Sequence, residues 1–160
     1  MACLDPQYYH RLLEPRLVGP GYAADVFKGG ELESVAFMAP IGGYTGQLWR
    51  FSPAADGAWR LSTLFRGPAL AATADDDGTI RLAPEVGPAA EWIVEPLDGP
   101  PGLAGRFARS VTVRLTTRLR GPGWSLDVAL GGELWQPTLA ERADRPGQVW
   151  LLAQTEALVG

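Results

Sequence analysis

Residues 58–68 read AWRLSTLFRGP and residues 112–122 read TVRLTTRLRGP, and the two stretches align without a gap. A weaker copy, LEPRLVGP, occupies residues 13–20 and ends on the same Gly-Pro. After each Gly-Pro the chain passes through a turn to a closing tryptophan, which is Trp49, Trp92 or Trp150. The same order of signals in three places indicates an internal threefold repeat.

Within each unit the apolar residues alternate with polar ones. Val111, Val113 and Leu115 share one parity, while Thr112 and Arg114 share the other. This is the period of a half-buried strand. About four such runs in each unit predict roughly twelve strands in all. The 20 Gly and 14 Pro interrupt almost every stretch long enough for a helix.

A unit of about 40 residues cannot bury its own apolar face, so the three units must share one core. Closing them around a pseudo-threefold axis also removes exposed sheet edges. We therefore expect an all-β chain that forms a single β-trefoil domain over residues 1–160, with repeats at about 9–53, 57–96 and 110–155. The three closing tryptophans should lie in the shared core, because they recur at one structural position.

Composition narrows the function classes. The formal net charge of -4 disfavours a nucleic-acid binder, which needs a basic surface. Cys3 is the only cysteine, so no internal disulfide and no cysteine-based zinc site is expected. The sequence shows neither an apolar run long enough to span a membrane nor a secretory signal at its start. We expect a cytoplasmic protein, or one exported without a visible signal.

Catalysis, cofactors and metals find little support in the sequence. His10 is the only histidine, and nothing around it resembles a nucleophile motif. No Gly-rich phosphate loop is present, so no cofactor is expected. The run Asp75-Asp76-Asp77-Gly78 lacks the spacing of a calcium loop and reads as a hairpin turn. The five arginines between Arg106 and Arg120 favour a solvated strand face over a site for an anion.

The closing segments Gln47-Leu48-Trp49 and Gln148-Val149-Trp150, with Asp25 and Asp127 upstream, resemble the Gln-x-Trp pattern of the ricin B-type β-trefoil lectins. The resemblance covers nearly the whole chain. It implies a non-enzymatic carbohydrate-binding module, in which an Asp accepts hydrogen bonds from a sugar and an aromatic ring stacks on it. Galactose-type sugars or glycans would be the ligands, and a homo-oligomer or a protein partner stays open.

By this resemblance the third repeat holds the foremost sugar site and the first repeat a second one. The site residues would be Asp127, Trp135, Gln136 and Gln148 in the third repeat, and Asp25, Phe37, Tyr44 and Gln47 in the first. The second repeat has Thr73 and Ala90 at the Asp and Gln positions, so its site should be inactive. The family usually has Asn before the Gln, where this chain has Gly46 and Gly147.

The residues also support structural readings of the same positions. Tyr22 and Trp124 share parity with apolar neighbours, so they should face the core, while Asp25 and Asp127 should lie on the surface. Each Asp could instead bond a backbone N–H of the following turn. Gln47 and Gln148 could tie the closing strand to a neighbouring turn.

Two other functions stay open at this point. The first is a protein-interaction trefoil with vestigial sugar sites, favoured by the missing Asn and by Thr73. The second is a β-trefoil protease inhibitor that presents the loop Arg142-Ala143-Asp144-Arg145-Pro146.

Overall fold

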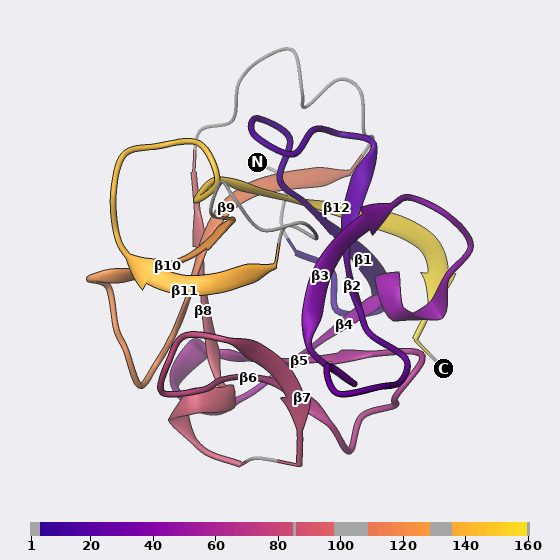
Figure 1. The fold of residues 1–160 in the computed structure, drawn as a ribbon, viewed down its shortest axis with the longest axis horizontal. Helices are drawn as coiled ribbons and strands as arrows, with labels where there is room; N and C mark the ends of the chain where they lie inside the picture. Colours follow the sequence, from indigo (N-terminus) through magenta and orange to yellow (C-terminus); the bar gives the residue numbers. More distant parts are fainter. Residues whose placement is uncertain (1–3, 85, 98–108, 129–135, 160) are drawn as a thin grey trace.

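The computed structural model describes residues 4–84, 86–97, 109–128 and 136–159 (Figure 1). Within this part the regular structure is antiparallel strand, with three short 3-10 turns and no α-helix. The strands of the first repeat are β1 (Tyr8–Leu13), β2 (Tyr22–Val26), β3 (Ala36–Pro40) and β4 (Trp49–Pro53). Those of the second are β5 (Trp59–Thr63), β6 (Ala71–Ala74), β7 (Ile80–Ala83) and β8 (Trp92–Pro96). Those of the third are β9 (Ser110–Thr117), β10 (Trp124–Val128), β11 (Pro137–Glu141) and β12 (Trp150–Leu158).

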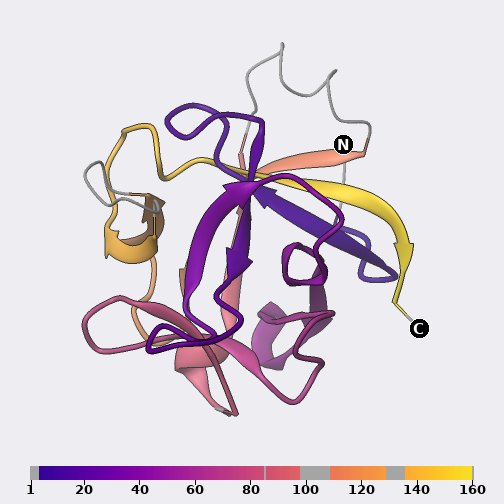
Figure 2. The same ribbon diagram turned by 45° about the vertical axis from the view of Figure 1, so that its right-hand side comes forward.

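The outer strands of the repeats form a closed barrel in the order β1-β12-β9-β8-β5-β4, and the inner strands form three hairpins, β2–β3, β6–β7 and β10–β11. Figure 1 shows the hairpins placed around the centre of the molecule, and Figure 2 shows the same arrangement turned by 45° about the vertical axis. The predicted β-trefoil, with four strands in each repeat, is confirmed. Among the described residues no helix is long and apolar enough to cross a membrane.

The hairpins also join one another near the pseudo-threefold axis. The Leu82 amide donates to the Ser34 carbonyl at 2.9 Å, and the Leu139 amide donates to the Gly78 carbonyl at 2.8 Å. Isolated bridges pair Val35 with Arg81, and Thr79 with Thr138. Backbone groups that would be orphaned at the hairpin ends are therefore satisfied by the neighbouring repeat.

The three closing tryptophans lie in the core, as predicted: Trp49, Trp92 and Trp150 are 3%, 1% and 0% exposed. Each indole N–H donates to a backbone carbonyl of the inner hairpin of its own repeat. The acceptors are the carbonyls of Ala24 at 3.0 Å, Ala72 at 2.8 Å and Leu126 at 3.0 Å. Each repeat thus places an indole ring at the same position in the core, with its N–H hydrogen-bonded.

The repeated Gly-Pro marks a turn that needs a positive φ. The φ angles of Gly19, Gly67 and Gly121 are 110°, 79° and 77°, a region that glycine enters without steric penalty. Their amides donate to the carbonyls of Glu14, Thr63 and Thr117 at 3.0, 2.8 and 2.9 Å. The repeated Gly-Pro therefore reflects a turn that needs a positive φ in every repeat, in addition to the core that the repeats share.

Glu14 is a buried carboxylate that the sequence reasoning did not single out. Its side chain is 0% exposed and accepts hydrogen bonds from the amides of Arg16, Leu17 and Val18 at 3.0, 2.8 and 2.7 Å. The Gly147 amide adds a fourth bond at 3.3 Å, which joins the first repeat to the third. Backbone donors of this number stabilise a buried carboxylate without a cation.

His10 is 1% exposed, and its ring meets Phe51 edge-on at 5.7 Å between centroids. Burial lowers the pKa of His10, because the charged imidazolium loses its hydration inside the barrel. The carbonyl of Tyr8 and the charge of Asp5 oppose this effect only in part. The folded protein therefore holds His10 in its neutral form.

Replacing Trp92 by Phe should destabilise the fold by about 2–4 kcal/mol, because the change leaves a cavity and an unpaired Ala72 carbonyl. The half-buried Trp59 gives a matched control, and Trp59→Phe should change the unfolding free energy by less than about 1 kcal/mol. Urea unfolding followed by circular dichroism measures both. Equal losses of unfolding free energy in the two variants would mean that the hydrogen bond from the Trp92 indole to the Ala72 carbonyl contributes nothing measurable to stability.

Stability should fall as the pH drops below the unfolded-state pKa of His10, 6.5. The unfolded chain then takes up a proton that the folded chain still refuses, so protonation favours unfolding until the pH reaches the lowered folded pKa. Urea midpoints at several pH values between 7.5 and 5 should drop more in the wild type than in His10→Gln. If both proteins lose stability in parallel, another group is responsible.

Candidate functional site

The predicted Asp and Gln residues of the first repeat contact each other. Gln47 Nε2 donates to Asp25 Oδ2 at 3.3 Å and to the Pro40 carbonyl at 2.9 Å. Gln47 Oε1 accepts from the Gly42 amide at 3.2 Å. Gln47 ends the 3-10 turn η1 (Thr45–Gln47), so its side chain ties the segment before β4 to the turn after β3.

The third repeat builds the same network. Gln148 Nε2 donates to Asp127 Oδ2 at 3.1 Å and to the Glu141 carbonyl at 2.8 Å. Gln148 Oε1 accepts from the Ala143 amide at 2.8 Å. The interpretation of both glutamines as ties between the closing strand and a neighbouring turn is confirmed.

The expectation that the two Asp side chains lie on the surface is wrong. Asp25 and Asp127 are 4% and 2% exposed. The alternation of side chains along a strand predicts one exposed face, but both faces of these inner hairpins are covered. The barrel core covers one face, and the turn that carries Gln47 or Gln148 covers the other. Tyr22, which should have faced the core, is instead 38% exposed, whereas Trp124 is partly buried and packs against the core, as expected.

Gly46 and Gly147 make room for the two carboxylates. A Cβ atom on Gly46 would lie 2.2 Å from Asp25 Oδ1, and one on Gly147 would lie 2.7 Å from Asp127 Oδ1. Both distances are far inside van der Waals contact. Glycine at the position where the resembled family usually has Asn therefore lets each Asp turn in against the backbone.

In the second repeat both partners of this network are absent together. Thr73 stands at the Asp position and donates its hydroxyl to the Ala71 carbonyl at 3.0 Å. Ala90 stands at the Gln position and is 1% exposed. Replacing both partners at once leaves no unpaired buried group, which is far less costly than replacing one.

In the third repeat a cation covers the carboxylate. Arg145 forms an ion pair with Asp127 Oδ2, and the arginine side chain is 53% exposed while that of Asp127 is 3% exposed. Arg114 Nη1 also donates to Gln148 Oε1 at 3.0 Å. Gln136 is half-buried just before β11, and Trp135 lies outside the described residues.

In the first repeat Asp25 lines an open pocket of about 330 Å³. Phe37 and Tyr44, the two predicted aromatic platforms, line it together with Asp25. Phe37 stacks on Phe27 with 4.2 Å between ring centroids and 18° between planes. Tyr44 is 52% exposed, so its ring is open to a small ligand, whereas Asp25 is 4% exposed at the inner wall of the hollow.

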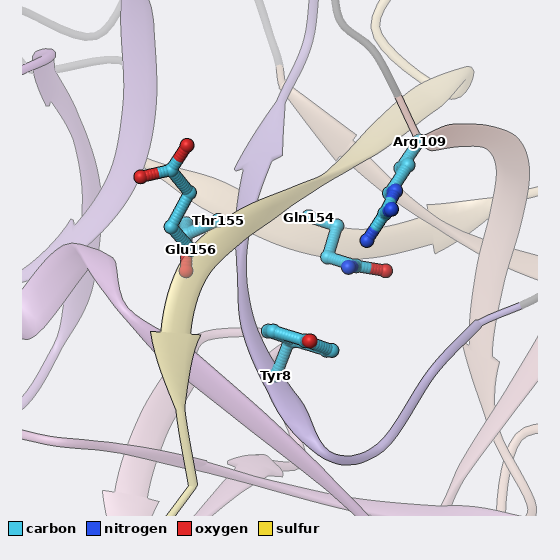
Figure 3. Close-up of a pocket in the computed structure, with 5 residues that line it drawn as sticks. All are labelled: Tyr8, Arg109, Gln154, Thr155 and Glu156. Atoms are coloured by element: carbon cyan, nitrogen blue, oxygen red, sulfur yellow. The ribbon is translucent and has the colours of Figure 1, made fainter.

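A second pocket of about 480 Å³, which no sequence signal indicated, lies between the chain ends of the barrel (Figure 3). It is lined by Tyr8 of β1, by Gln154, Thr155 and Glu156 of β12, and by Arg109 just before β9. Figure 3 shows the Arg109 guanidinium pointing toward the Gln154 amide, whereas the Glu156 carboxylate points away to the other side of β12. The residues that line this pocket are far apart in the sequence and are brought together by the pairing of β12 with β1 and β9.

The arginines of the segment 106–120 do not form a free basic surface where the structure describes them. Arg118 pairs with Glu91 and with Asp56, the latter at 2.9 Å. Arg120 donates to the Asp76 carbonyl at 2.7 Å and lies 4.7 Å from the centre of the Trp124 ring. The sequence predicts a solvated strand face here, but Arg118 and Arg120 lie in the turn after β9 and are bonded to other parts of the chain.

The acidic run 75–78 forms the hairpin turn that the sequence predicts, with the Gly78 amide bonded to the Asp75 carbonyl at 2.9 Å. Among the described residues no group of three or more His, Cys, Asp or Glu side chains is arranged to hold a metal ion.

Replacing Gly46 by Ala should destabilise the protein by about 1–3 kcal/mol, because the new methyl group overlaps Asp25. Gly43→Ala is the matched control, since an added Cβ there meets no atom within 4 Å. In the double variant Gly46→Ala/Asp25→Ala the overlap is gone, so its loss should be smaller than the sum of the two single losses. Thermal unfolding measures all four proteins, and simple additivity would contradict the packing described here.

No protein-family model and no curated protein matches the sequence. Solved structures do match. A Macrolepiota procera ricin B-like lectin, solved with lactose, superposes with a TM-score of 0.69 at 16% identity, over 96% of this chain and 99% of that one. SeviL bound to asialo-GM1 saccharide gives a TM-score of 0.62 at 13% identity, over 91% and 95% of the two chains.

A GlcNAcα1-4Gal-releasing endo-β-galactosidase from Clostridium perfringens gives a TM-score of 0.70 at 14% identity. The match covers 93% of this chain but only 33% of the galactosidase chain, so this chain spans about a third of that enzyme. At these identities the likeness concerns the fold. The chain has the β-trefoil fold of the ricin B-like lectins.

Proposed function

We propose that this protein is a non-enzymatic carbohydrate-binding module whose sugar pocket lies in the first repeat. The observation that carries the proposal is the meeting of Asp25 with Phe37 and Tyr44 at one pocket of about 330 Å³. Sugar recognition needs acceptors for hydroxyl groups beside an apolar face for ring C–H groups. A hollow of this size lies in the usual range of small-molecule sites, about 300–1,000 Å³, and galactose-type sugars are the ligands that the family resemblance implies.

Asp25 keeps acceptor capacity for a ligand. Its Oδ1 accepts from the Val26 amide at 2.8 Å, and its Oδ2 accepts from Gln47 Nε2 at 3.3 Å. A carboxylate has about four lone-pair sites, so these two bonds leave roughly two unused, and a sugar would reach them at the small part of Asp25 that is exposed, 4% of the residue. The two protein bonds hold the carboxylate in place before a sugar arrives, which reduces the entropy lost on binding.

The first repeat is favoured over the third, which the sequence reasoning had placed foremost. Asp127 Oδ2 already accepts from both Gln148 and Arg145. A sugar in the third repeat would have to displace the Arg145 side chain before it reached the carboxylate. Asp25 has no such cover among the described residues, where no cation pairs with it.

A non-enzymatic role is supported by the position of the only histidine. His10 is buried beside Phe51 in the barrel and does not line the pocket of the first repeat. Among the described residues that line the pocket the single carboxylate is Asp25, whereas glycoside hydrolysis generally needs two that face one bond.

A protein-binding role is the second candidate, because apolar side chains gather beside the same pocket. Leu64 and Phe65 are 44% and 37% exposed, and the Phe65 amide donates to the Thr45 carbonyl at 3.3 Å, next to Tyr44. The protease-inhibitor reading has less support. In the candidate loop, Arg142 pairs with Glu95 at 3.1 Å and Arg145 with Asp127.

Titration calorimetry with lactose, together with a glycan array, tests the proposal. Asp25→Asn should weaken binding by about tenfold, because the amide replaces one acceptor and brings a donor in its place. Phe37→Ala should weaken it similarly through the loss of the apolar face. Asp127→Asn is the matched control and should bind like the wild type.

Loss of binding in Asp127→Asn but not in Asp25→Asn would move the site to the third repeat. Absence of binding to every glycan would reject the lectin function, and pull-down experiments with a Phe65→Ser control would then test for a protein partner.

A further inference from the structure

We propose that the pocket of the first repeat selects sugars that carry a negative charge, a carboxylate or a sulfate, and that Lys28 makes this selection. The inference rests on the proposed function, because it names the class of sugar that the same pocket takes. Lys28 lines the pocket together with Asp25 and Tyr44. It is the only lysine of the chain, and every other permanently cationic side chain is an arginine.

Aromatic rings hold the lysine at the pocket. Its Nζ atom lies 5.0 Å from the centre of the Tyr44 ring and 5.4 Å from that of Phe65, within the range of cation–π attraction. Tyr44 stands just before η1 and Phe65 just after β5, so two segments distant in sequence converge on one ammonium group. Such placement limits the freedom of a side chain that is otherwise long and flexible.

Of the acids close to Lys28 in the sequence, Glu33 and Asp25 are bonded to other residues, and exposed Glu31 forms no ion pair with Lys28. Glu33 pairs with Arg66 at 2.5 Å, and Arg66 in turn lies 5.2 Å from the centre of the Phe65 ring. Asp25 is bonded by Val26 and Gln47, as described above. Within the described residues no carboxylate forms an ion pair with Lys28. The ammonium group therefore offers its N–H donors to solvent or to a ligand.

The two kinds of sugar meet this lysine differently. A neutral sugar offers the ammonium group only hydroxyl oxygens as acceptors, which form ordinary hydrogen bonds. An acidic group placed at the Lys28 end of the pocket, away from Asp25, instead gains a charge-assisted hydrogen bond, which is stronger than a neutral one. The difference corresponds to about a tenfold preference for the acidic sugar at low salt.

The second repeat shows that the fold itself does not need a cation at this position. Lys28 is the third residue after Asp25, and the third residue after Thr73 is Asp76, of opposite charge. Asp75, Asp76 and Asp77 make the corresponding hollow of the second repeat acidic. Of these two repeats only the first has a cation at this position, as expected if Lys28 binds a ligand.

Paired ligands and paired variants test the inference. Galactose and galacturonic acid differ only at C6, and a glycan array can hold neutral glycans beside their sialylated and sulfated counterparts. Calorimetry should show that the wild type binds galacturonic acid about tenfold more tightly than galactose, with a preference that shrinks as salt is added. Lys28→Gln should bind both sugars alike, and Lys28→Arg should keep the preference.

Two outcomes overturn the inference, and they are distinguishable. If the wild type binds neutral and acidic sugars equally, or if Lys28→Gln retains the preference, charge selection by Lys28 is rejected while sugar binding stands. If neither the titrations nor the array show any binding, the proposed function fails and the inference fails with it. Circular dichroism of the variants checks that the exposed substitution leaves the fold intact.

Discussion

The indole N–H of each closing tryptophan fixes the geometry on which the rest of the molecule depends. Trp49, Trp92 and Trp150 fill the barrel core, and each donates to the carbonyl of an inner strand of its own repeat. In the first and third repeats that carbonyl belongs to the residue just before the buried Asp. The same bond that closes the repeat therefore also sets where the candidate site residue stands.

On this shared frame the three repeats have diverged in their chemistry. The first presents Asp25 at an open, aromatic pocket. The second has replaced both Asp and Gln, which keeps its interior satisfied but removes the acceptor. The third keeps both residues and covers the carboxylate with Arg145. Because the tryptophan bond and the Gly-Pro turn carry stability, the residues around the pockets are free to change without loss of the fold.

The sequence predicts the three-repeat fold better than it predicts the arrangement of the candidate site residues. Core tryptophans and positive-φ glycines are set by local requirements that recur in each repeat, so the repeat reveals them. The alternation along the strand predicts an exposed Asp25, but the turn that carries Gln47, 22 residues later in the chain, covers the outer face of that strand. The ion pair of Arg145 with Asp127 and the bond from the Gly147 amide to Glu14 depend on contacts between segments that are distant in sequence. No pattern of single residues encodes those contacts.

An amide NMR titration of the ¹⁵N-labelled protein with lactose and with an acidic galactoside tests most directly whether sugars bind in the first repeat. Shift changes should be concentrated at residues 25–28, 37 and 44, with little change around Arg145 or around the barrel-end residues Tyr8 and Gln154. Shifts concentrated at the third repeat or at the barrel end would contradict the placement of the site. A spectrum that stays unchanged with every sugar would contradict carbohydrate binding itself.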